Sequence, residues 1–364
     1  MNDVQDKARE EKVQDERLTC VALATGMKCL PQAKLARAQG NVLHDWHAEV
    51  LAMRGFNRWI LDECMVLARD KSRQNRTTTK WVQYARRDDT QPGPRFELLP
   101  NISVHMYCSA APCGDASMEL LMRSQPDSTP WTHPAPSAKQ DDMIGRGHFD
   151  QLGVVRKKPA RPDAPSTLSK SCSDKLSLRQ VTGLLGGMAA KLVGPERCYL
   201  ASLVLPEDEV VREGVERAFG KEGRMRELVG MEEHAGYAFR PFEVMGTSRV
   251  FEYAVQEEAR GSDLSALWTL HRQEILINGV LQGRKQFDPR GASCVSRREM
   301  WKLAWDVTAE VGGDEDESFS AETYKAAKGA GSDAREAAKE RARNKALKGW
   351  RRNTGDEDWS LNIP

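Results

Sequence analysis

An alternating stretch that runs straight into a helical pattern constrains this chain most. Ile102, Val104, Met106 and Cys108 alternate with polar residues, which is the period of a half-buried β-strand. The next segment, AAPCGDASMELLMR, changes to a helical pattern: Pro112 can stand at or just before the helix start, and residues 117–123 continue the helix. Strands followed by helices build α/β folds, so we expect an α/β protein with its best-marked sites at strand ends and helix starts.

Predicted strands and helices also alternate along the rest of the chain. A helix beginning near Asp45 has apolar residues at steps of three and four from Val50 to Leu67, and a second helix follows SCSD, with an apolar stripe from Leu176 to Leu192. Further strands are predicted at residues 18–23, from 198, and at 240–246, 249–256 and 268–278, and further helices at 210–219, 299–311 and 321–350, with a break at 329–331.

Composition and charge indicate one globular protein of the soluble type. Of the 364 residues, 40% are hydrophobic and 29% charged, and the formal net charge is +1, so any affinity for nucleic acid must come from a local patch. There is no run of about 18 apolar residues that could span a membrane, and the charged N-terminus is not a secretory signal. The eight cysteines are spread over a long chain without a signal peptide, which favours reduced thiols and an intracellular location, in the cytoplasm or the nucleus. No pair has CxxC spacing, so a zinc finger or a thioredoxin motif is not expected.

The domain organisation is predicted to be simple. We interpret residues 1–18 as an irregular, charged lead-in and residues 19–364 as a single domain. Residues 124–169 are rich in Pro, Ser, Asp and Lys, which predicts a long surface insertion within that domain.

Three residues at predicted helix starts could bind a catalytic zinc ion. His47, Cys113 and Cys172 supply the three protein ligands that such a site needs, and Glu49 could shuttle a proton beside it. Taken singly, such a histidine is more often a helix cap and such a cysteine a small buried hydrophobe. Together, HAE on a helix and PCG after a strand form the H-x-E…P-C pattern of zinc-dependent nucleobase deaminases. His44 and Asp45 are interpreted as an ordinary helix entry.

The three motifs HAEV, PCGDAS and SCSDK resemble those of the deaminases that edit adenosine in RNA. Position 116 is Ala, so the CxxC ligand pair of simpler deaminases is absent, and in the editing family SCSDK supplies the third ligand. The resemblance implies zinc bound by His47, Cys113 and Cys172, Glu49 as the proton shuttle, and a deaminase fold with a mixed sheet flanked by helices. It also places Lys28 near the substrate, although a solvated turn lysine is an equally good interpretation.

Details of HDWHAEV, PCGDAS and VALATGMKCLP are similar to the tRNA-specific branch of that family, above all its fungal members. That branch converts the adenosine immediately 3′ of the anticodon of alanine tRNA to inosine, so tRNA is the expected partner, with no membrane and no obligate protein partner. The segment of about 20 residues before the first strand is too short for a double-stranded-RNA-binding module. The alternatives are a deaminase of mRNA or duplex RNA, and a catalytically silent RNA-binding relative, for which Glu49 would not be required.

The resemblance further implies an inositol hexakisphosphate enclosed by the helical C-terminal part of the domain. A polyanion in a protein interior needs lysines and arginines around it. The family's contacts correspond to Arg54, Lys175, Arg297, Tyr324, Lys328, Trp350 and Asp358. Tyr324 and Lys328 are four residues apart and would share one helix face. Without the resemblance, residues 325–352 would be interpreted as a solvated basic helix.

Overall fold

The computed structural model describes residues 17–70, 77–86, 93–130, 145, 147–158, 164–254, 261–312 and 320–361. Most of the expected lead-in, residues 1–16, therefore lies outside the described residues, and Arg17 and Leu18 have no regular structure. Among the described residues, no helix is long and apolar enough to cross a membrane.

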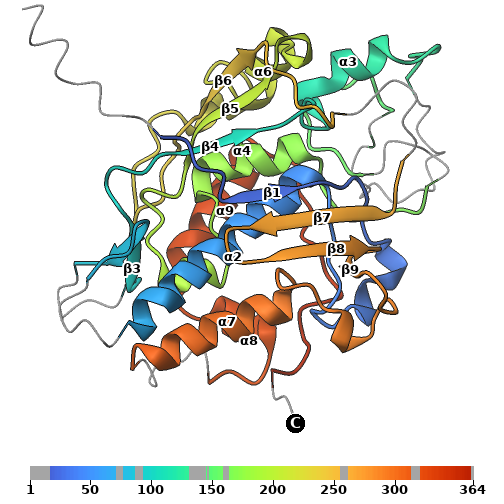
Figure 1. The fold of residues 1–364 in the computed structure, drawn as a ribbon. Coiled ribbons are helices and arrows are strands. Elements are labelled where there is room, and N and C mark those ends of the chain that lie inside the picture. The colour runs from blue at the N-terminus through green and yellow to red at the C-terminus, as the bar shows by residue number, and fades with distance from the viewer. Residues whose placement is uncertain are drawn as a thin grey trace, which may run out of the picture.

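The strands form separate parallel and antiparallel sheets (Figure 1). The parallel sheet has the order β4-β5-β6, and an antiparallel sheet has the order β1-β7-β8-β9; β2 and β3 form a small antiparallel pair. The strands are β1 Ala22–Ala24, β2 Val82–Tyr84, β3 Phe96–Leu98, β4 Val104–Tyr107, β5 Leu200–Pro206, β6 Glu243–Thr247, β7 Leu264–Thr269, β8 Gln273–Ile277 and β9 Val280–Leu281. The α/β prediction is confirmed, but in the described part of the chain the strands do not join into one mixed sheet.

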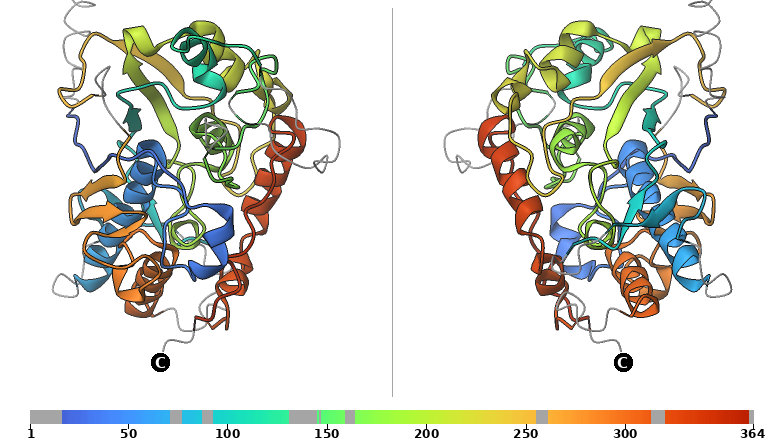
Figure 2. Two further views of the ribbon diagram at one scale, coloured as in Figure 1. Left: turned by 90° about the vertical axis from the view of Figure 1, so that its right-hand side faces the viewer. Right: turned by 90° about the vertical axis from the view of Figure 1, so that its left-hand side faces the viewer.

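Helix α2 occupies the centre of the molecule. Its residues from Phe56 to Cys64 are almost entirely buried, and it contacts β1, β7 and helix α7. The hairpin of β7 and β8 and helix α9 lie on opposite sides of the molecule, with α2 and α4 between them (Figure 2). The α-helices are α2 Ala48–Arg69, α3 Met118–Arg123, α4 Cys172–Thr182, α5 Ala189–Leu192, α6 Arg212–Phe219, α7 Arg297–Glu310, α8 Tyr324–Gly329 and α9 Asp333–Lys345. Short 3-10 helices are η1 Gln32–Arg37, η2 Asp115–Ser117, η3 Glu207–Glu209, η4 Arg224–Leu228 and η5 Pro289–Gly291.

Some elements predicted as continuous are interrupted. The apolar stripe from Leu176 to Leu192 is divided between α4 and α5, because Gly183 ends α4 with a φ of 60°. The strand predicted at residues 268–278 is part of a hairpin, in which Thr269 and Arg272 close the turn between β7 and β8. Residues 249–254 form no strand, and the last two residues of that predicted strand lie outside the described residues.

The predicted surface insertion is wrong in its final part. Arg156 has no exposed surface and Lys158 is only 2% exposed. Lys158 donates its backbone N–H to Ser169 at 2.8 Å, and Ser171 donates to Arg156 at 2.9 Å, so the segment pairs with the residues just before α4. The insertion therefore returns to the interior at the start of α4.

Candidate active site

The entry and first turn of α2 carry two of the predicted functional groups. His47 precedes the helix in an extended conformation, with a φ of −61° and a ψ of 145°, and Glu49 lies in the first turn. Residues two apart in mid-helix point in different directions. Because His47 lies outside the helix, this restriction does not separate it from Glu49.

Cys113 and Cys172 are neighbours in space although they are 59 positions apart in the chain. Cys113 lies in the loop between β4 and η2, and Cys172 is the first residue of α4. The Cys172 N–H donates to the Cys113 sulfur at 3.4 Å, and the Ser173 N–H donates to the Cys113 carbonyl oxygen at 3.0 Å. Gly114 permits this approach, because a Cβ there would lie 2.2 Å from Ser171 Oγ. The strand end and the helix start thus bring two thiols together.

The carboxylate of Glu49 acts electrostatically on this region. Burial raises the pKa of the Cys172 thiol well above its ordinary value, and the neighbouring Cys113 and the charge of Glu49 raise it further. Burial also raises the pKa of Cys108, directly after β4, again with a contribution from Glu49. Glu49 therefore lies near both the thiol pair and the end of β4.

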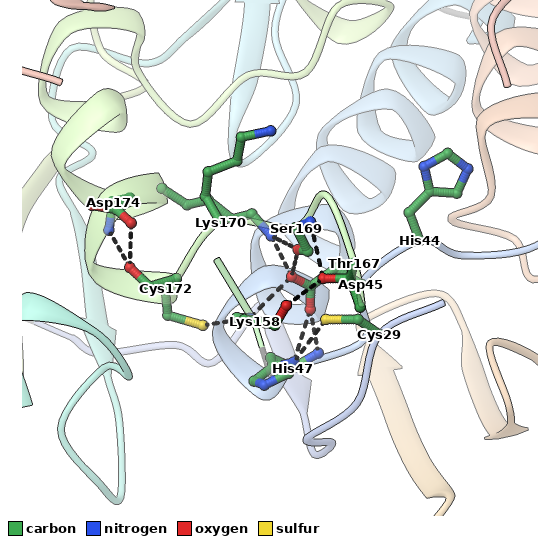
Figure 3. Close-up of polar contacts among 12 residues, drawn as sticks. Cys29, His44, Asp45, His47, Lys158, Thr167, Ser169, Lys170, Cys172 and Asp174 are labelled. Carbon is green, nitrogen blue, oxygen red and sulfur yellow. Dashed lines mark hydrogen bonds and ion pairs between the residues drawn. The ribbon is translucent and has the colours of Figure 1, made fainter. Parts of the chain in front are cut away.

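Asp45 connects His47 to Cys172 through the ammonium group of Lys158 (Figure 3). One carboxylate oxygen of Asp45 accepts the His47 N–H at 3.0 Å and lies 2.9 Å from His47 Nδ1. The other accepts from Lys158 Nζ at 3.0 Å, and the same ammonium group lies 3.2 Å from the Cys172 sulfur. Lys175 Nζ and Ser169 Oγ also donate to this oxygen. The interpretation of Asp45 as an ordinary helix entry is therefore wrong, and neither Asp45 nor Lys158 was identified from the sequence.

The charges in this network stabilise one another. Burial alone would raise the pKa of Asp45, but Lys158 and Lys175 hold it well below its ordinary value. Burial alone would lower the pKa of Lys158, but Asp45 raises it well above its usual range. For His47, burial is likewise outweighed by Asp45, which raises the pKa of the metal-free ring to about 10.

A second set of possible metal ligands overlaps the first. Cys29, Asp45 and His47 have ligand atoms within 4.8 Å of one another, and no other such group of three occurs among the described residues. This donor set fits a metal site, whereas His47, Cys113 and Cys172 are not drawn together that closely. However, two ammonium groups already neutralise Asp45, which makes its carboxylate a poor ligand for a further cation. Asp45 is better placed to orient His47, as carboxylates do for metal-bound imidazoles.

A group of cations that we call the buried basic cluster lies deeper in the molecule. Its members come from four helices and are Arg54, Arg179, Lys328, Arg335 and Lys339. Arg335 and Lys339 are buried, Arg54 and Arg179 are half-buried, and Lys328 extends to the surface. Burial and neighbouring positive charges lower the pKa of Arg179 to about 9, that of Lys328 to about 8 and that of Lys339 to about 6.

Little in the protein itself neutralises the buried basic cluster. Glu336 pairs with Lys339, but Nε of Arg335 is buried without a hydrogen-bond partner, as are Nε and Nη1 of the adjacent Arg343. Arg179 and Arg335 both donate to the carbonyl oxygen of Leu185, at 3.0 and 2.7 Å. Repulsion among buried cations destabilises a fold unless an anion lies between them, so the cluster has the chemistry of a polyanion site.

The structure brings only some of the predicted polyanion contacts to this cluster. The charges of Arg54 and Arg335 interact with Tyr324, and the Trp350 ring centroid lies 5.4 Å from Lys170 Nζ and 5.8 Å from Arg343 Cζ. Of the other three contacts, Arg297 lies near the cluster, because its charge lowers the pKa of Arg54 and of Lys328, whereas neither Lys175 nor Asp358 is among the main causes of these two shifts. Lys175 binds Asp45, Arg297 binds Asp356, and Asp358 is 66% exposed and lies 3.6 Å from Lys325.

The sequence analysis did not select Arg335 or Lys339. They lie four residues apart on α9 and are only 6% and 7% exposed. The sequence feature that could have identified them is the pair of small residues Ala338 and Ala342, which lie on the same face of α9 and let this helix approach α4 closely. Lys28, the predicted substrate contact, lies at the surface, where its ammonium group is 2.5 Å from Asp263.

Comparisons with known proteins agree with this arrangement. Residues 22–354 match the family described as the adenosine-deaminase (editase) domain. The chain is 34% identical over 311 residues to "tRNA-specific adenosine deaminase 1" of Schizosaccharomyces pombe, covering 83% of this chain and 76% of the relative.

Two other relatives match over shorter regions. The protein of the same name from Saccharomyces cerevisiae is 36% identical over 203 residues, covering 53% of this chain and 48% of the relative. "Double-stranded RNA-specific adenosine deaminase" of Mus musculus is 31% identical over 196 residues, covering 51% of this chain and 16% of the relative. On the family match across most of its length, the chain belongs to the adenosine-deaminase (editase) domain family.

Proposed function

We propose that this protein is a zinc-dependent tRNA adenosine deaminase, which acts on the adenosine immediately 3′ of the anticodon of alanine tRNA. The observation that carries the proposal is that Glu49, two residues after His47 in the first turn of α2, acts electrostatically on Cys172, whose N–H contacts the Cys113 sulfur. The names of the S. pombe and S. cerevisiae relatives support tRNA as the substrate class.

The donor set suits zinc. An imidazole and two thiols are ligands that zinc prefers, and three protein ligands leave a fourth position for water. Burial, the neighbouring Cys113 and the charge of Glu49 raise the pKa of Cys172, so this thiol is protonated in the metal-free protein. When bound, zinc would supply a water molecule acidic enough to attack at neutral pH.

The protein residues then have distinct roles. Glu49 accepts a proton from the attacking water and delivers protons to N1 and to the amino group of the adenine. Water adds at C6, the C6–N bond breaks, and adenosine and water become inosine and ammonia. Asp45 orients His47, and Lys158 donates to the Cys172 sulfur, so both groups hold the ligands in place.

The buried basic cluster supports the second part of the proposal, a resident inositol hexakisphosphate. Arg335 and Lys339 are buried, Arg54 and Arg179 are half-buried, and Arg343 and Lys170 lie nearby, so that cations outnumber the carboxylates here; Glu336 pairs with Lys339. The unpartnered guanidinium nitrogens of Arg335 and Arg343 are suited to phosphate oxygens. Arg179, Arg335 and Lys339 would then be contacts in addition to Arg54, Tyr324, Lys328 and Trp350.

The activity can be tested with the purified chain and alanine tRNA. Inosine is quantified by sequencing, and bound zinc by elemental analysis, for the wild type, for Glu49→Gln and for the exposed control Glu233→Gln. We expect inosine beside the anticodon with the wild type and the control, and none with Glu49→Gln, which should keep its zinc.

Other results would assign the protein differently. Inosine formation that survives Glu49→Gln contradicts the proposed role of Glu49. Inosine in duplex RNA but not in tRNA would favour the duplex-editing alternative, for which the M. musculus relative is the precedent. For the polyanion, phosphate analysis of the extract after denaturation should find inositol hexakisphosphate; an extract without it from active enzyme contradicts that part of the proposal.

A further inference from the structure

We infer that three exposed aromatic side chains beside the active site stack against unpaired bases of the substrate RNA. The residues are Tyr107, Phe251 and Tyr253, which we call the aromatic rim. The inference rests on the proposed function, and it assigns the contacts that hold the nucleotides on either side of the target adenosine.

The aromatic rim is a built feature of the surface. The Phe251 N–H donates to the Tyr107 hydroxyl at 3.1 Å. The rings of Phe251 and Tyr253 are 5.7 Å apart in an edge-to-face arrangement. Tyr107 is 42% exposed, Phe251 39% and Tyr253 76%, and none of the three belongs to a hydrophobic core cluster of the described residues. The chain thus orders three rings without burying them.

The segment that carries two of these rings is anchored on both sides of the active site. At one end, Phe251 is bonded to Tyr107, which directly precedes Cys108 and the loop to Cys113. At the other end, Gly261 lies against Met27, and Asp263 pairs with Lys28. Lys28 is followed by Cys29, whose sulfur is 3.6 Å from His47 Nδ1. The described ends of the β6–β7 connection therefore lie beside Tyr107, at the end of the strand that leads to Cys113, and beside the segment that brings Cys29 to His47.

Unpaired RNA bases are the ligand that fits this position. A deaminase must take its target base out of the stack, which leaves the faces of the flanking bases uncovered. Proteins bind such bases by stacking them on Tyr and Phe, with little dependence on sequence. Five side chains in and beside the rim are large, apolar and at least 39% exposed, and such a cluster close to a site indicates contact with a ligand. They are Tyr107, Met245, Val250, Phe251 and Tyr253.

The test compares single-turnover deamination of alanine tRNA by the wild type, Tyr253→Ala, Tyr253→Trp and Trp305→Ala. Trp305 is the matched control, since it is 47% exposed and pairs with Trp301 on α7, away from the site. Losing one base–aromatic stack weakens binding by about tenfold or more. We expect Tyr253→Ala to raise the half-saturating protein concentration by about that factor, and Tyr253→Trp and Trp305→Ala to leave it within about twofold.

Two further readouts separate stacking from other effects. Stacking does not release counterions, so the dependence of the half-saturating concentration on salt should keep its slope in Tyr253→Ala. Thermal unfolding should also be unchanged, since the ring is mostly exposed.

The outcomes are distinguishable. A wild-type chain that forms no inosine contradicts the proposed function, and this inference with it. A wild-type chain that is active while Tyr253→Ala has the same half-saturating concentration overturns the inference alone, and the rim would then be a protein-binding surface. A lower salt slope in Tyr253→Ala also overturns it, because the residue would then act through phosphate contacts.

Discussion

Replacing Asp45 by asparagine should strongly destabilise the protein, because it leaves two lysines facing no carboxylate. Lys158 is 2% exposed, its ammonium lies 3.0 Å from Asp45, and Lys175 binds the same oxygen. Removing one partner of a buried ion pair costs about 3–5 kcal/mol, a large part of the roughly 5–15 kcal/mol that stabilises a typical domain. Urea unfolding followed by circular dichroism measures the loss. With a slope of about 3 kcal/mol per M, the midpoint of Asp45→Asn should fall by about 1–1.7 M.

Two further variants make this prediction specific. Glu233 pairs with Arg240 at 2.8 Å but is 53% exposed, so Glu233→Gln should cost less than about 1 kcal/mol. Combining Asp45→Asn with Lys158→Met removes the more deeply buried of the two unpaired lysine charges, so the double variant should regain at least about 1 kcal/mol over Asp45→Asn. A loss below about 1 kcal/mol in Asp45→Asn, or no recovery in the double variant, would refute the reasoning.

Three further predictions concern the supporting structure. Gly114→Ala should abolish zinc retention, measured by elemental analysis, because the new Cβ would lie 2.2 Å from Ser171 Oγ; zinc bound at the wild-type ratio would contradict this. Burial and the charge of Arg297 lower the pKa of His44 to about 4, so the unfolded chain binds a proton first as the pH falls. The stability that neutral His44 contributes is complete above about pH 6.5 and decreases as the pH falls from 6.5 to 4. Between pH 7 and 5 the free energy of unfolding should fall by about 2 kcal/mol, and urea titrations should show a smaller fall in His44→Gln. Finally, burial and Arg335 lower the pKa of Lys339 to about 6, so Lys339→Met should raise the melting temperature of the anion-free protein. Adding inositol hexakisphosphate should then raise the melting temperature of Lys339→Met by less than that of the wild type. The same rise in both proteins would count against the polyanion site.

Features with a local sequence signal could be predicted. The apolar period places α2 and the alternation places β4. Helix α4 begins within SCSD and not after it, because Ser171 is its cap and accepts from the Asp174 N–H at 3.1 Å. These signals extend over fewer than about twenty residues, so each can be seen without knowledge of the fold. They were sufficient to select the residues at the entry of α2 and the start of α4.

Features that depend on distant partners could not be predicted. Lys158 binds Asp45 across 113 positions, and a lysine in a proline-rich polar stretch gives no sign that it will be buried. The end of α4 at Gly183 interrupts an apolar stripe that continues on the other side, so periodicity alone predicts one helix. Arg335 and Lys339 resemble solvated helix residues until α9 packs against α4.

The long chain separation between the two cysteine sulfurs has a consequence for folding. They stand 59 positions apart, whereas a CxxC pair closes a loop of three. Bringing the ends of a flexible chain together costs about 2–3 kcal/mol more over the longer distance, by the logarithmic dependence on length. A zinc ion held by both sulfurs would therefore act as a cross-link, which removes that freedom from the unfolded chain. Removing the metal with a chelator should then lower the free energy of unfolding, so the metal would stabilise the fold as well as take part in the reaction.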